Sequence, residues 1–222
     1  MNDFTSPLSR PVKHIAESTV RRLSLYLRFL EGFEAQGQTT ISSGELALSG
    51  GTTSAQVRKD LSFFGSFGKR GLGYDVRDLI GSIREILGLH RSWSVVIIGA
   101  GKIGAALAQY RGFTQRGFNI VGVYDKDPAR VGTKLDDVTV RPDSELERDI
   151  QRLKPQIAVL CVPGEAAQLL VDRVTKAGVR AVLNFAPAQL HVPEGVTLRA
   201  VNMATELEIL AFGLSHPEER AS

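Results

Sequence analysis

The sequence is poor in cysteine and has no long apolar run. Cys161 is the sole cysteine among 222 residues, so no disulfide forms within the chain, and neither a CxxC motif nor another metal-ligand spacing is present. No run of about 18 apolar residues occurs, which excludes a membrane-spanning helix. The first ten residues lack the apolar segment of a secretory signal. These absences predict a cytoplasmic protein with no membrane partner and no metal.

Histidine is also scarce, and no catalytic group is recognisable. His191 stands in an expected loop before Pro193, and His216 lies near the C-terminus, each without an obvious carboxylate partner in the sequence. Cys161 falls inside the apolar run 157–162, where a cysteine is usually an inert packing residue. The sequence therefore predicts no catalytic residues and a protein that is not an enzyme.

The composition is that of a globular chain with a local basic region. Hydrophobic residues make up 43% and charged residues 23%, which suits one large or two small domains with buried cores. The net charge is only +3, but within residues 51–74 Arg58, Lys59, Lys69 and Arg70 face a single acidic residue, Asp60. Such a patch attracts polyanions, although a solvated charged surface is the alternative interpretation.

The N-terminal part has the pattern of a helix-turn-helix. Residues 1–16 are expected to form a loose arm, and apolar residues at helical spacing predict a helix over 19–36. The pairs Ser42/Glu45 and Thr53/Gln56 have the spacing of capping boxes and predict helices ending near residues 48 and 64. Two short helices joined by a glycine turn after a first helix predict a DNA-binding head.

A glycine-rich segment, residues 65–74, follows the third helix. Aromatic residues at both ends predict a two-stranded hairpin, or wing, with Lys69 and Arg70 at its tip, before a fourth helix over 76–88. The second helix of a helix-turn-helix enters the major groove, so it and the wing supply the expected DNA contacts. These are Thr53, Ser54, Gln56, Arg58, Lys59, Lys69 and Arg70, while Asp60 is expected to orient a neighbouring basic group. A helical module that docks proteins is the alternative.

From residue 93 onward short apolar runs alternate with helical patterns. Strands are predicted at 95–98, 120–124, 157–162 and 179–184, and helices at 103–113, 144–153 and 165–177. This alternation predicts an α/β fold with a parallel, Rossmann-type sheet covered by helices on both faces. A last helix over 202–214 carries Met203, Leu207, Leu210 and Leu214 on one stripe.

A dinucleotide-binding fingerprint lies between the first of these strands and its helix. The run Gly99-Ala100-Gly101-Lys102-Ile103-Gly104 is a G-x-G-x-x-G in the strand-to-helix context that gives the motif its meaning. The first glycine permits the tight turn, the second admits a pyrophosphate, and the third lets helix and strand pack closely. The start of the helix offers its free N–H groups to the phosphates.

An acidic residue follows the fingerprint at the expected distance. Asp125 comes 21 residues after Gly104, at the end of the strand 120–124, where a carboxylate accepts hydrogen bonds from a ribose 2′-hydroxyl. This favours NAD(H) over NADP(H), although the adjacent Lys126 weakens the discrimination.

Oxidised and reduced coenzyme differ mainly at the nicotinamide ring, which is cationic in NAD+ and neutral in NADH. Burying an unpaired cation is costly, so an apolar pocket selects NADH. The expected lining residues within the chain are Tyr110, Phe113 and Phe185. Residues at the carboxyl ends of two strands complete the expected site, namely Val162, Pro163, Asn184 and Ala186.

Several of these segments together resemble the Rex family of redox-sensing transcriptional repressors. The similar segments are Arg21-Arg22-Leu23, Leu25-Tyr26-Leu27-Arg28, 56–65, 68–74, the glycine fingerprint and Asn184-Phe185-Ala186-Pro187. The resemblance implies a homodimer whose two heads read an inverted-repeat operator in double-stranded DNA and release it when NADH binds. It also implies that the last helix is swapped onto the partner subunit near the nicotinamide, so that the partner's Met203 joins the expected lining of the coenzyme pocket.

The resemblance implies a switch contact as well, and here the sequence departs from the family. In the family an arginine at the end of the first helix pairs with an aspartate before the swapped helix. Arg28 matches that arginine, but Asn202 stands at the aspartate position, followed by Met203 where phenylalanine is frequent. The side-chain oxygen of asparagine can accept a hydrogen bond from an arginine but carries no negative charge. An Arg28–Asn202 contact is therefore expected to be weaker than an ion pair.

The expected domains are a winged-helix head over 1–90, a Rossmann NAD(H)-binding body over 91–200, and a swapped dimerisation helix with its tail over 201–222. Two other functions fit parts of the same pattern. One is an NAD-dependent dehydrogenase with an additional domain, and the other is a winged-helix regulator whose body senses coenzyme A or another nucleotide.

Overall fold

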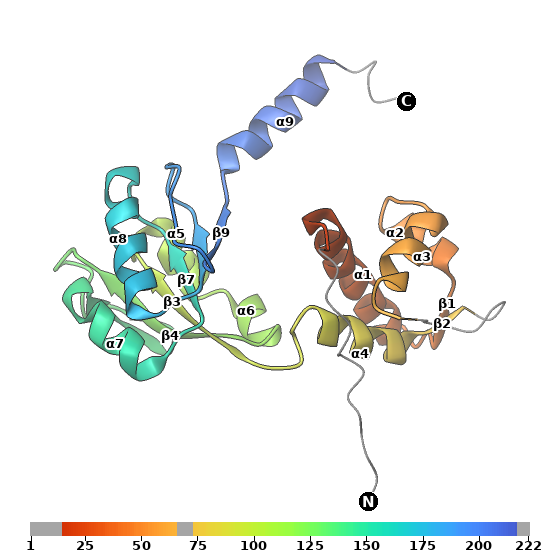
Figure 1. The fold of residues 1–222 in the computed structure, drawn as a ribbon, viewed down its shortest axis with the longest axis horizontal. Helices are drawn as coiled ribbons and strands as arrows, with labels where there is room; N and C mark the ends of the chain where they lie inside the picture. The colour runs from red at the N-terminus through yellow and green to blue at the C-terminus, as the bar shows by residue number, and fades with distance from the viewer. Residues whose placement is uncertain (1–14, 66–72, 217–222) are drawn as a thin grey trace, which may run out of the picture. The chain divides into compact units, whose positions relative to one another are not determined.

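The structure is a computed structural model and describes residues 15–65 and 73–216. The chain divides into two compact units, Met1–Arg91 and Ser92–Ser222 (Figure 1). The first consists mainly of helices and the second is built around a sheet. No helix in the described part of the chain is long and apolar enough to cross a membrane.

The first unit packs its helices around one apolar cluster. Its elements are α1 (Glu17–Ala35), β1 (Thr40–Ile41), α2 (Ser43–Ser49), α3 (Ser54–Ser62), β2 (Tyr74–Asp75) and α4 (Val76–Ile86). Of the apolar residues of α1 that recur at helical spacing, Leu23, Tyr26, Leu27 and Leu30 are buried and Phe33 is half-buried. They meet Leu46, Val57, Leu61 and the buried face of α4. The four helices expected from the sequence are confirmed.

The two predicted helix starts are capped by their own side chains, but only one of them is a full capping box. Ser42 accepts a hydrogen bond from the amide of Glu45, whose carboxylate accepts one from the amide of Ser42. Thr53 likewise accepts from the amide of Gln56 at 3.1 Å. The side chain of Gln56 does not return this bond, because it donates to Asp60 instead.

The wing expected over residues 65–74 falls largely outside the described residues, which include neither Lys69 nor Arg70. At its C-terminal end Tyr74 and Asp75 form β2, which pairs antiparallel with β1. Strand β1 was not expected from the sequence. Its pairing with β2 joins the segment between α1 and α2 to the segment before α4. Asp75 then caps α4 by accepting a hydrogen bond from the amide of Asp78.

The sheet of the second unit has the strand order of a doubly wound dinucleotide-binding fold. Its strands are β3 (Trp93–Ile98), β4 (Phe118–Asp125), β5 (Lys134–Leu135), β6 (Val138–Pro142), β7 (Ile157–Leu160), β8 (Ala181–Asn184) and β9 (Thr197–Ala200). In space the order is β5-β6-β4-β3-β7-β8-β9, and every neighbouring pair is parallel except β5 with β6. The four predicted strands are present, whereas the short strands β5, β6 and β9 were not expected.

Alternate residues of the sheet point to two separate clusters. Val96 and Ile98 of β3 join a cluster with α7 (Leu146–Leu153) and α8 (Gly164–Ala177), which follow the 3-10 turn η1 (Asp143–Glu145). Val95 and Ile97 point to the opposite face and join a cluster with α5 (Lys102–Ala108). Helices on both faces of the sheet were predicted. Because successive side chains of β3 point to opposite faces and both faces are buried, every residue from Val95 to Ile98 is apolar.

The helix predicted over 103–113 is wrong in its extent, because it breaks into α5 and α6 (Arg111–Gln115). Tyr110 has an extended backbone, with φ −79° and ψ 100°, and is the residue immediately before α6. Its ring lies where a side chain at residue 112 would be, since a Cβ on Gly112 would stand 2.5 Å from the ring. The ring then packs edge-to-face on Phe113, with 5.1 Å between ring centroids.

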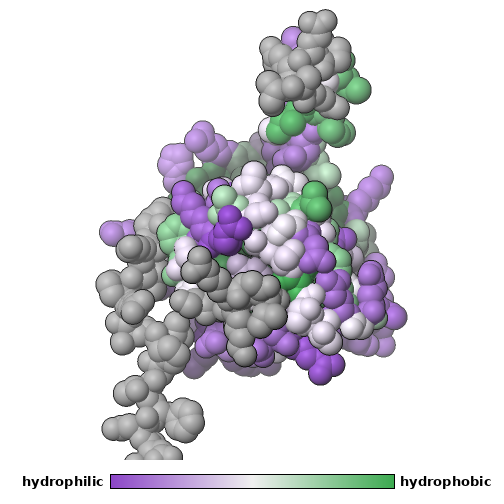
Figure 2. Space-filling view, turned by 90° about the vertical axis from the view of Figure 1, so that its right-hand side faces the viewer, coloured by the Kyte–Doolittle hydropathy of each residue, from purple (hydrophilic) through white to green (hydrophobic). Residues whose placement is uncertain are grey.

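In the last helix, α9 (Met203–Ser215), every residue except the half-buried Gly213 is exposed. Met203, Leu207, Leu210 and Leu214 form the expected stripe, but Ile209 and Phe212 on another side are also more than half exposed. Apolar side chains are visible on this helix at the top of Figure 2. A helix that is apolar on more than one face is stable in water only when something covers it.

Candidate functional site

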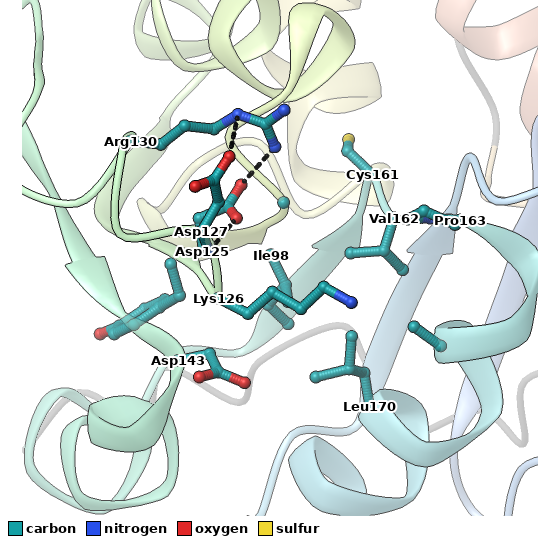
Figure 3. A pocket seen from close by; sticks show the side chains of 13 residues that line it. Ile98, Asp125, Lys126, Asp127, Arg130, Asp143, Cys161, Val162, Pro163 and Leu170 are labelled. Carbon is teal, nitrogen blue, oxygen red and sulfur yellow. Dashed lines mark hydrogen bonds and ion pairs between the residues drawn. The ribbon is translucent and has the colours of Figure 1, made fainter.

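A cleft of about 520 Å³ opens at the carboxyl ends of β3, β4 and β7. The chain leaves β3 toward β4 on one side and later returns to β7 on the other, so the cleft lies at the point where the strand order reverses. Figure 3 shows the acidic and basic side chains after β4 on one side and residues 161–163 with Leu170 opposite. Its lining residues are Ile98, Gly99, Tyr124, Asp125, Lys126, Asp127, Arg130, Asp143, Cys161, Val162, Pro163, Ala166 and Leu170.

The glycines of the fingerprint have three different surroundings. Gly99 has φ +96°, and a Cβ there would stand 2.3 Å from the carbonyl oxygen of Cys161, so only glycine fits the turn. A Cβ on Gly104 would stand 1.8 Å from the carbonyl oxygen of Gly99, which explains how closely α5 packs on β3. A Cβ on Gly101 would meet only Arg130, at 4.0 Å. The absent side chain of Gly101 is therefore not needed for packing and leaves the backbone open to a ligand.

Asp125 lies at the end of β4 and is almost fully buried, with 6% of its surface exposed. Its carboxylate accepts hydrogen bonds from the amide of Ala100 at 2.6 Å, the amide of Asp127 at 2.9 Å and Nη1 of Arg130 at 3.2 Å. Burial acts to raise the pKa of Asp125, but these three donors outweigh it and hold the pKa below its ordinary value. The side chain is thus a fixed carboxylate beside the glycine loop.

Arg130 is a cleft residue that the sequence reasoning missed. It follows Asp125 by five residues, and its guanidinium also reaches Asp127 at 3.6 Å (Figure 3). In the sequence, the only indication of this role is that an arginine follows the acidic residues Asp125 and Asp127 within five residues. No periodic pattern predicts that the chain turns back there. Cys161 also lines the cleft, where burial raises the pKa of its thiol to about 12 and keeps it protonated.

The predicted coenzyme residues fall into groups of different placement. Gly99, Asp125, Lys126, Val162 and Pro163 line the cleft. Ala100 and Gly101 form the adjoining loop, and Lys102, Ile103 and Gly104 begin α5.

The remaining predicted coenzyme residues do not line this cleft. Asn184 is buried and uses its amide within the loop after β8, where it contacts the backbone of Ala186 and Ala188. Phe185 is half-buried on the α5 face of the sheet. Tyr110 is 59% exposed, and Met203 lies on the uncovered helix α9.

The first unit contains a buried ionic cluster that fixes α3 to α1. Asp60 is fully buried and accepts two hydrogen bonds from Arg22, at 2.6 and 2.7 Å, one from Tyr26 at 3.0 Å and one from Gln56 at 2.7 Å. Burial acts to raise the pKa of Asp60, but these donors keep it below its ordinary value. Burial and the hydrogen bond to Asp60 also raise the pKa of Tyr26 to about 12. Asp60 therefore orients Arg22 within the head. This agrees with the expectation that Asp60 orients a neighbouring basic group.

The residues expected to contact DNA differ in how free their side chains are. Thr53 caps α3, and Gln56 donates its amide to Asp60, so both have a role within the head. Arg58 donates to Ser43 of α2 at 3.0 Å, which ties its guanidinium to the preceding helix. Ser54 is half-buried at the start of α3, and Lys59 is exposed near its end. Lys69 and Arg70 lie outside the described residues.

The two residues of the expected switch lie in different units, Arg28 exposed on α1 and Asn202 before α9. Asn202 caps α9, because its side-chain oxygen accepts from the amides of Ala204 at 3.0 Å and Thr205 at 3.4 Å. Asparagine and aspartate cap helices equally well. The substitution therefore leaves the start of α9 intact and removes only the charge.

The cleft suits the adenosine half of a dinucleotide. It combines a glycine loop with an open backbone at Gly101, a fixed carboxylate, and cations at Lys126 and Arg130. About four lone-pair positions exist on a carboxylate, and three are used, so one stays available to a ribose hydroxyl. In the part of the chain that the structure describes, no group of three metal-ligating side chains is found.

Comparison with known proteins matches both units. Residues 14–62 match the family described as "Putative DNA-binding protein N-terminus", and residues 90–188 match the family described as "CoA binding domain". A protein of Pelotomaculum thermopropionicum named "Redox-sensing transcriptional repressor Rex" is 47% identical over 207 residues, which cover 93% of this chain and 97% of that protein.

Two solved structures are similar over nearly the whole chain. One is described as RSP in complex with β-NAD+ and operator DNA; it has a TM-score of 0.89, is 38% identical, and is matched over 93% of this chain and 95% of its own. The other is RSP in complex with β-NADH, with a TM-score of 0.85, 37% identity, and matches over 93% and 97% of the two chains. The similarity thus includes both units and their order.

Proposed function

Because this chain belongs to the Rex family of redox-sensing transcriptional repressors, we propose that it represses genes by binding an inverted-repeat operator as a homodimer and that NADH releases it. The function is regulatory rather than catalytic. We assign residues 1–90 to DNA binding, 91–200 to NAD(H) binding, and 201–222 to a dimerisation helix and tail. Its place of action is the cytoplasm, where the operator and the coenzyme meet.

The observation that supports this proposal best is the pairing of two sites in one chain. A fixed carboxylate stands beside an open glycine loop at the switch point of a doubly wound sheet, as NAD(H) requires. The other unit carries a capped helix-turn-helix whose second helix presents Arg58 and Lys59. The open acceptor position of Asp125 favours an unmodified ribose, so NADH is favoured over coenzyme A for the body.

Discrimination between NADH and NAD+ rests on the charge of the nicotinamide. A hundredfold preference for NADH requires about 2.8 kcal/mol, which is modest beside the cost of burying an unpaired cation. Tyr110 and Phe113 form an aromatic pair near the start of α6, and Phe185 lies on the α5 face of the sheet. We propose that these rings, with the partner's Met203, enclose the neutral ring.

We propose that α9 is the dimerisation element. Its exposed apolar side chains need a cover, and the sheet offers one on the α5 face, where Leu183 and Phe185 of the β8 region are only half-buried. Swapping α9 between two subunits covers both surfaces at once.

Introducing two further glutamates on the apolar stripe of α9 will therefore separate the subunits. We expect the double variant Leu207→Glu, Leu210→Glu to sediment as a monomer at micromolar concentration and to lose most of its affinity for a two-half-site operator, since two charges cannot be buried unpaired. Glu208→Gln on the same helix is the control and will remain a dimer. A double variant that sediments as a dimer would disprove the role of α9.

The proposal is tested by the linkage between coenzyme and operator. Coupling between two sites is reciprocal, so operator DNA must weaken NADH binding by the same factor by which NADH weakens operator binding. Calorimetric titration of NADH into free protein and into the protein–operator complex measures one factor, and operator titration with and without NADH measures the other. Equal affinity of NADH for free and operator-bound protein would reject the proposal.

A further inference from the structure

The carboxylate of Asp60 has hydrogen-bond partners on both oxygens, and one partner is Gln56 of α3, the second helix of the helix-turn-helix. Oδ2 accepts from Nε of Arg22 at 2.6 Å and from the hydroxyl of Tyr26 at 3.0 Å. Oδ1 accepts from Nη2 of Arg22 and from Nε2 of Gln56, each at 2.7 Å. A carboxylate offers about four acceptor positions, so this cluster uses all of them. The side chain of Gln56 is therefore held against a group that is itself fixed to α1.

This contact determines which end of the Gln56 amide faces outward. An ionised carboxylate only accepts hydrogen bonds, so the NH2 end of the amide must face Asp60, and the reversed amide would place two oxygens against each other. Among residues 15–65 and 73–216 the side-chain oxygen of Gln56 has no hydrogen-bond donor, and no buried polar side-chain atom there lacks a partner. The oxygen of this half-buried side chain therefore reaches the surface as an acceptor of fixed orientation.

Gln56 is the third residue of α3, in the N-terminal half of the helix that reaches base edges when a helix-turn-helix binds DNA. On the edge that faces the major groove, adenine and cytosine carry an amino donor, whereas guanine and thymine carry a carbonyl acceptor. We infer that Asp60 holds Gln56 as an oriented acceptor that selects an amino base, adenine or cytosine, over a keto base at one position of each operator half-site. Gln56 is thus a specificity-determining residue and Asp60 its positioning residue. The inference rests on the proposed DNA-binding function.

The fixed orientation is what makes the selection one-sided. A glutamine whose amide turns freely can meet a carbonyl oxygen with its NH2 end as well as an amino group with its oxygen. Reversing the amide of Gln56 would break its charge-assisted hydrogen bond to Asp60. A guanine or thymine at the contacted position would therefore bring its carbonyl oxygen against another acceptor, and neither oxygen would be satisfied.

The test uses an operator that the unchanged chain selects from a pool of random DNA duplexes. Each base pair of the half-site is then exchanged in turn, in both half-sites, between A·T and G·C with the purine kept on its strand, which swaps amino and keto groups in the major groove. Fluorescence anisotropy measures the affinity for each duplex. We expect one position at which the exchange weakens binding of the unchanged chain at least about tenfold, but weakens binding of Gln56→Met no more than about twofold. If no position depends on Gln56 in this way, the inference is overturned.

Asp60→Asn tests the positioning role on the same set of duplexes. An asparagine amide both donates and accepts, so it can bond Gln56 in either orientation and no longer fixes its oxygen outward. We expect the preference for an amino base at the Gln56 position to fall to about twofold or less, while the preferences at the other positions stay as they are. Circular dichroism first establishes a temperature at which each variant is folded, so that lost stability is not mistaken for lost selection. Full preference in Asp60→Asn would overturn the positioning role.

Tyr26→Phe is the matched control. It removes another hydrogen bond to Asp60, so it loosens the same buried cluster, but it leaves the contact between Asp60 and Gln56 in place. It will keep the full preference for an amino base, and an equal loss in Tyr26→Phe and Asp60→Asn would show that the cluster acts only through stability. Failure of the proposed function is distinguishable. NADH that binds without releasing operator would overturn the proposed sensing alone, whereas an unchanged chain that prefers no DNA sequence would overturn both.

Discussion

Replacing Asp60 with alanine will unfold the N-terminal unit at a temperature at which the unchanged unit is intact. Asp60 holds Arg22 of α1, Tyr26 of α1 and Gln56 of α3 in one buried cluster, so its loss leaves a cation and two polar groups without their acceptor. Removing one partner of a buried ion pair costs about 3–5 kcal/mol, and we expect the lower end because Arg22 is a quarter exposed. A loss of about 3 kcal/mol lowers the melting temperature of a unit of this size by roughly 12 °C or more.

A control for this variant lies on α1, the helix that carries the two residues Arg22 and Tyr26 bound by Asp60. Glu34 of α1 accepts from Arg77 of α4 at 3.2 Å, but both side chains are well exposed, so Glu34→Ala will change stability by less than about 1 kcal/mol. Thermal unfolding followed by circular dichroism compares the two variants, and operator affinity at 25 °C provides the functional measurement. A melting temperature of Asp60→Ala within 2 °C of the Glu34→Ala value would show that the cluster does not stabilise the head.

The same cluster predicts the response of the head to acid. Because the pKa of Asp60 is lower in the folded head than its ordinary value of 3.8, its contribution is fully present above that value. It is lost as the pH falls through the lower pKa of the folded state.

The third glycine of the fingerprint will tolerate alanine far less well than the second. A Cβ on Gly104 would stand 1.8 Å from the carbonyl oxygen of Gly99, so Gly104→Ala must move α5 away from β3. Forced overpacking of this kind typically costs about 1–3 kcal/mol, and the displaced loop will lose NADH binding altogether. The melting temperature of the C-terminal unit and the calorimetric NADH affinity are the measurements.

Gly101→Ala is the informative counterpart. Its Cβ would meet only Arg130, at 4.0 Å, and the backbone at φ −67° accepts any residue, so the fold will stay within about 0.5 kcal/mol of the unchanged chain. Its methyl group nevertheless stands where the backbone must approach the pyrophosphate, and we expect NADH affinity to fall at least about tenfold. If Gly104→Ala bound NADH normally, or Gly101→Ala bound it without loss, the assignment of the loop would be wrong.

Much of the fold was predictable because its signals are local and periodic. The capped starts of α2 and α3, the apolar stripe of α1 and the buried strands β3 and β4 each follow from residues close together in the chain. Strands β1, β5 and β9 were not predicted because two to four residues give no period, and what fixes them is pairing with a distant partner. The break at Tyr110 likewise depends on a ring folding over Gly112, which spacing alone does not indicate.

The candidate site was predictable in its framework but not in its electrostatics. Gly99, Gly101, Gly104 and Asp125 form a motif whose spacing carries the geometry. Arg130 was missed because its role arises from a turn that brings it back onto Asp125. The bond from Gln56 to Asp60 was missed for a related reason, since the capping pattern at Thr53 accounts for the amide of Gln56 but not for its side chain.

The central claim is that a neutral reduced nicotinamide bound in the C-terminal unit weakens the hold of two N-terminal units on DNA. Fluorescence anisotropy of a labelled inverted-repeat operator, titrated with protein at saturating NADH and again at saturating NAD+, measures it directly. We predict that operator affinity is at least about tenfold lower with NADH than with NAD+, in line with the 1–3 kcal/mol typical of such coupling. Equal operator affinity with both forms of the coenzyme would contradict the claim.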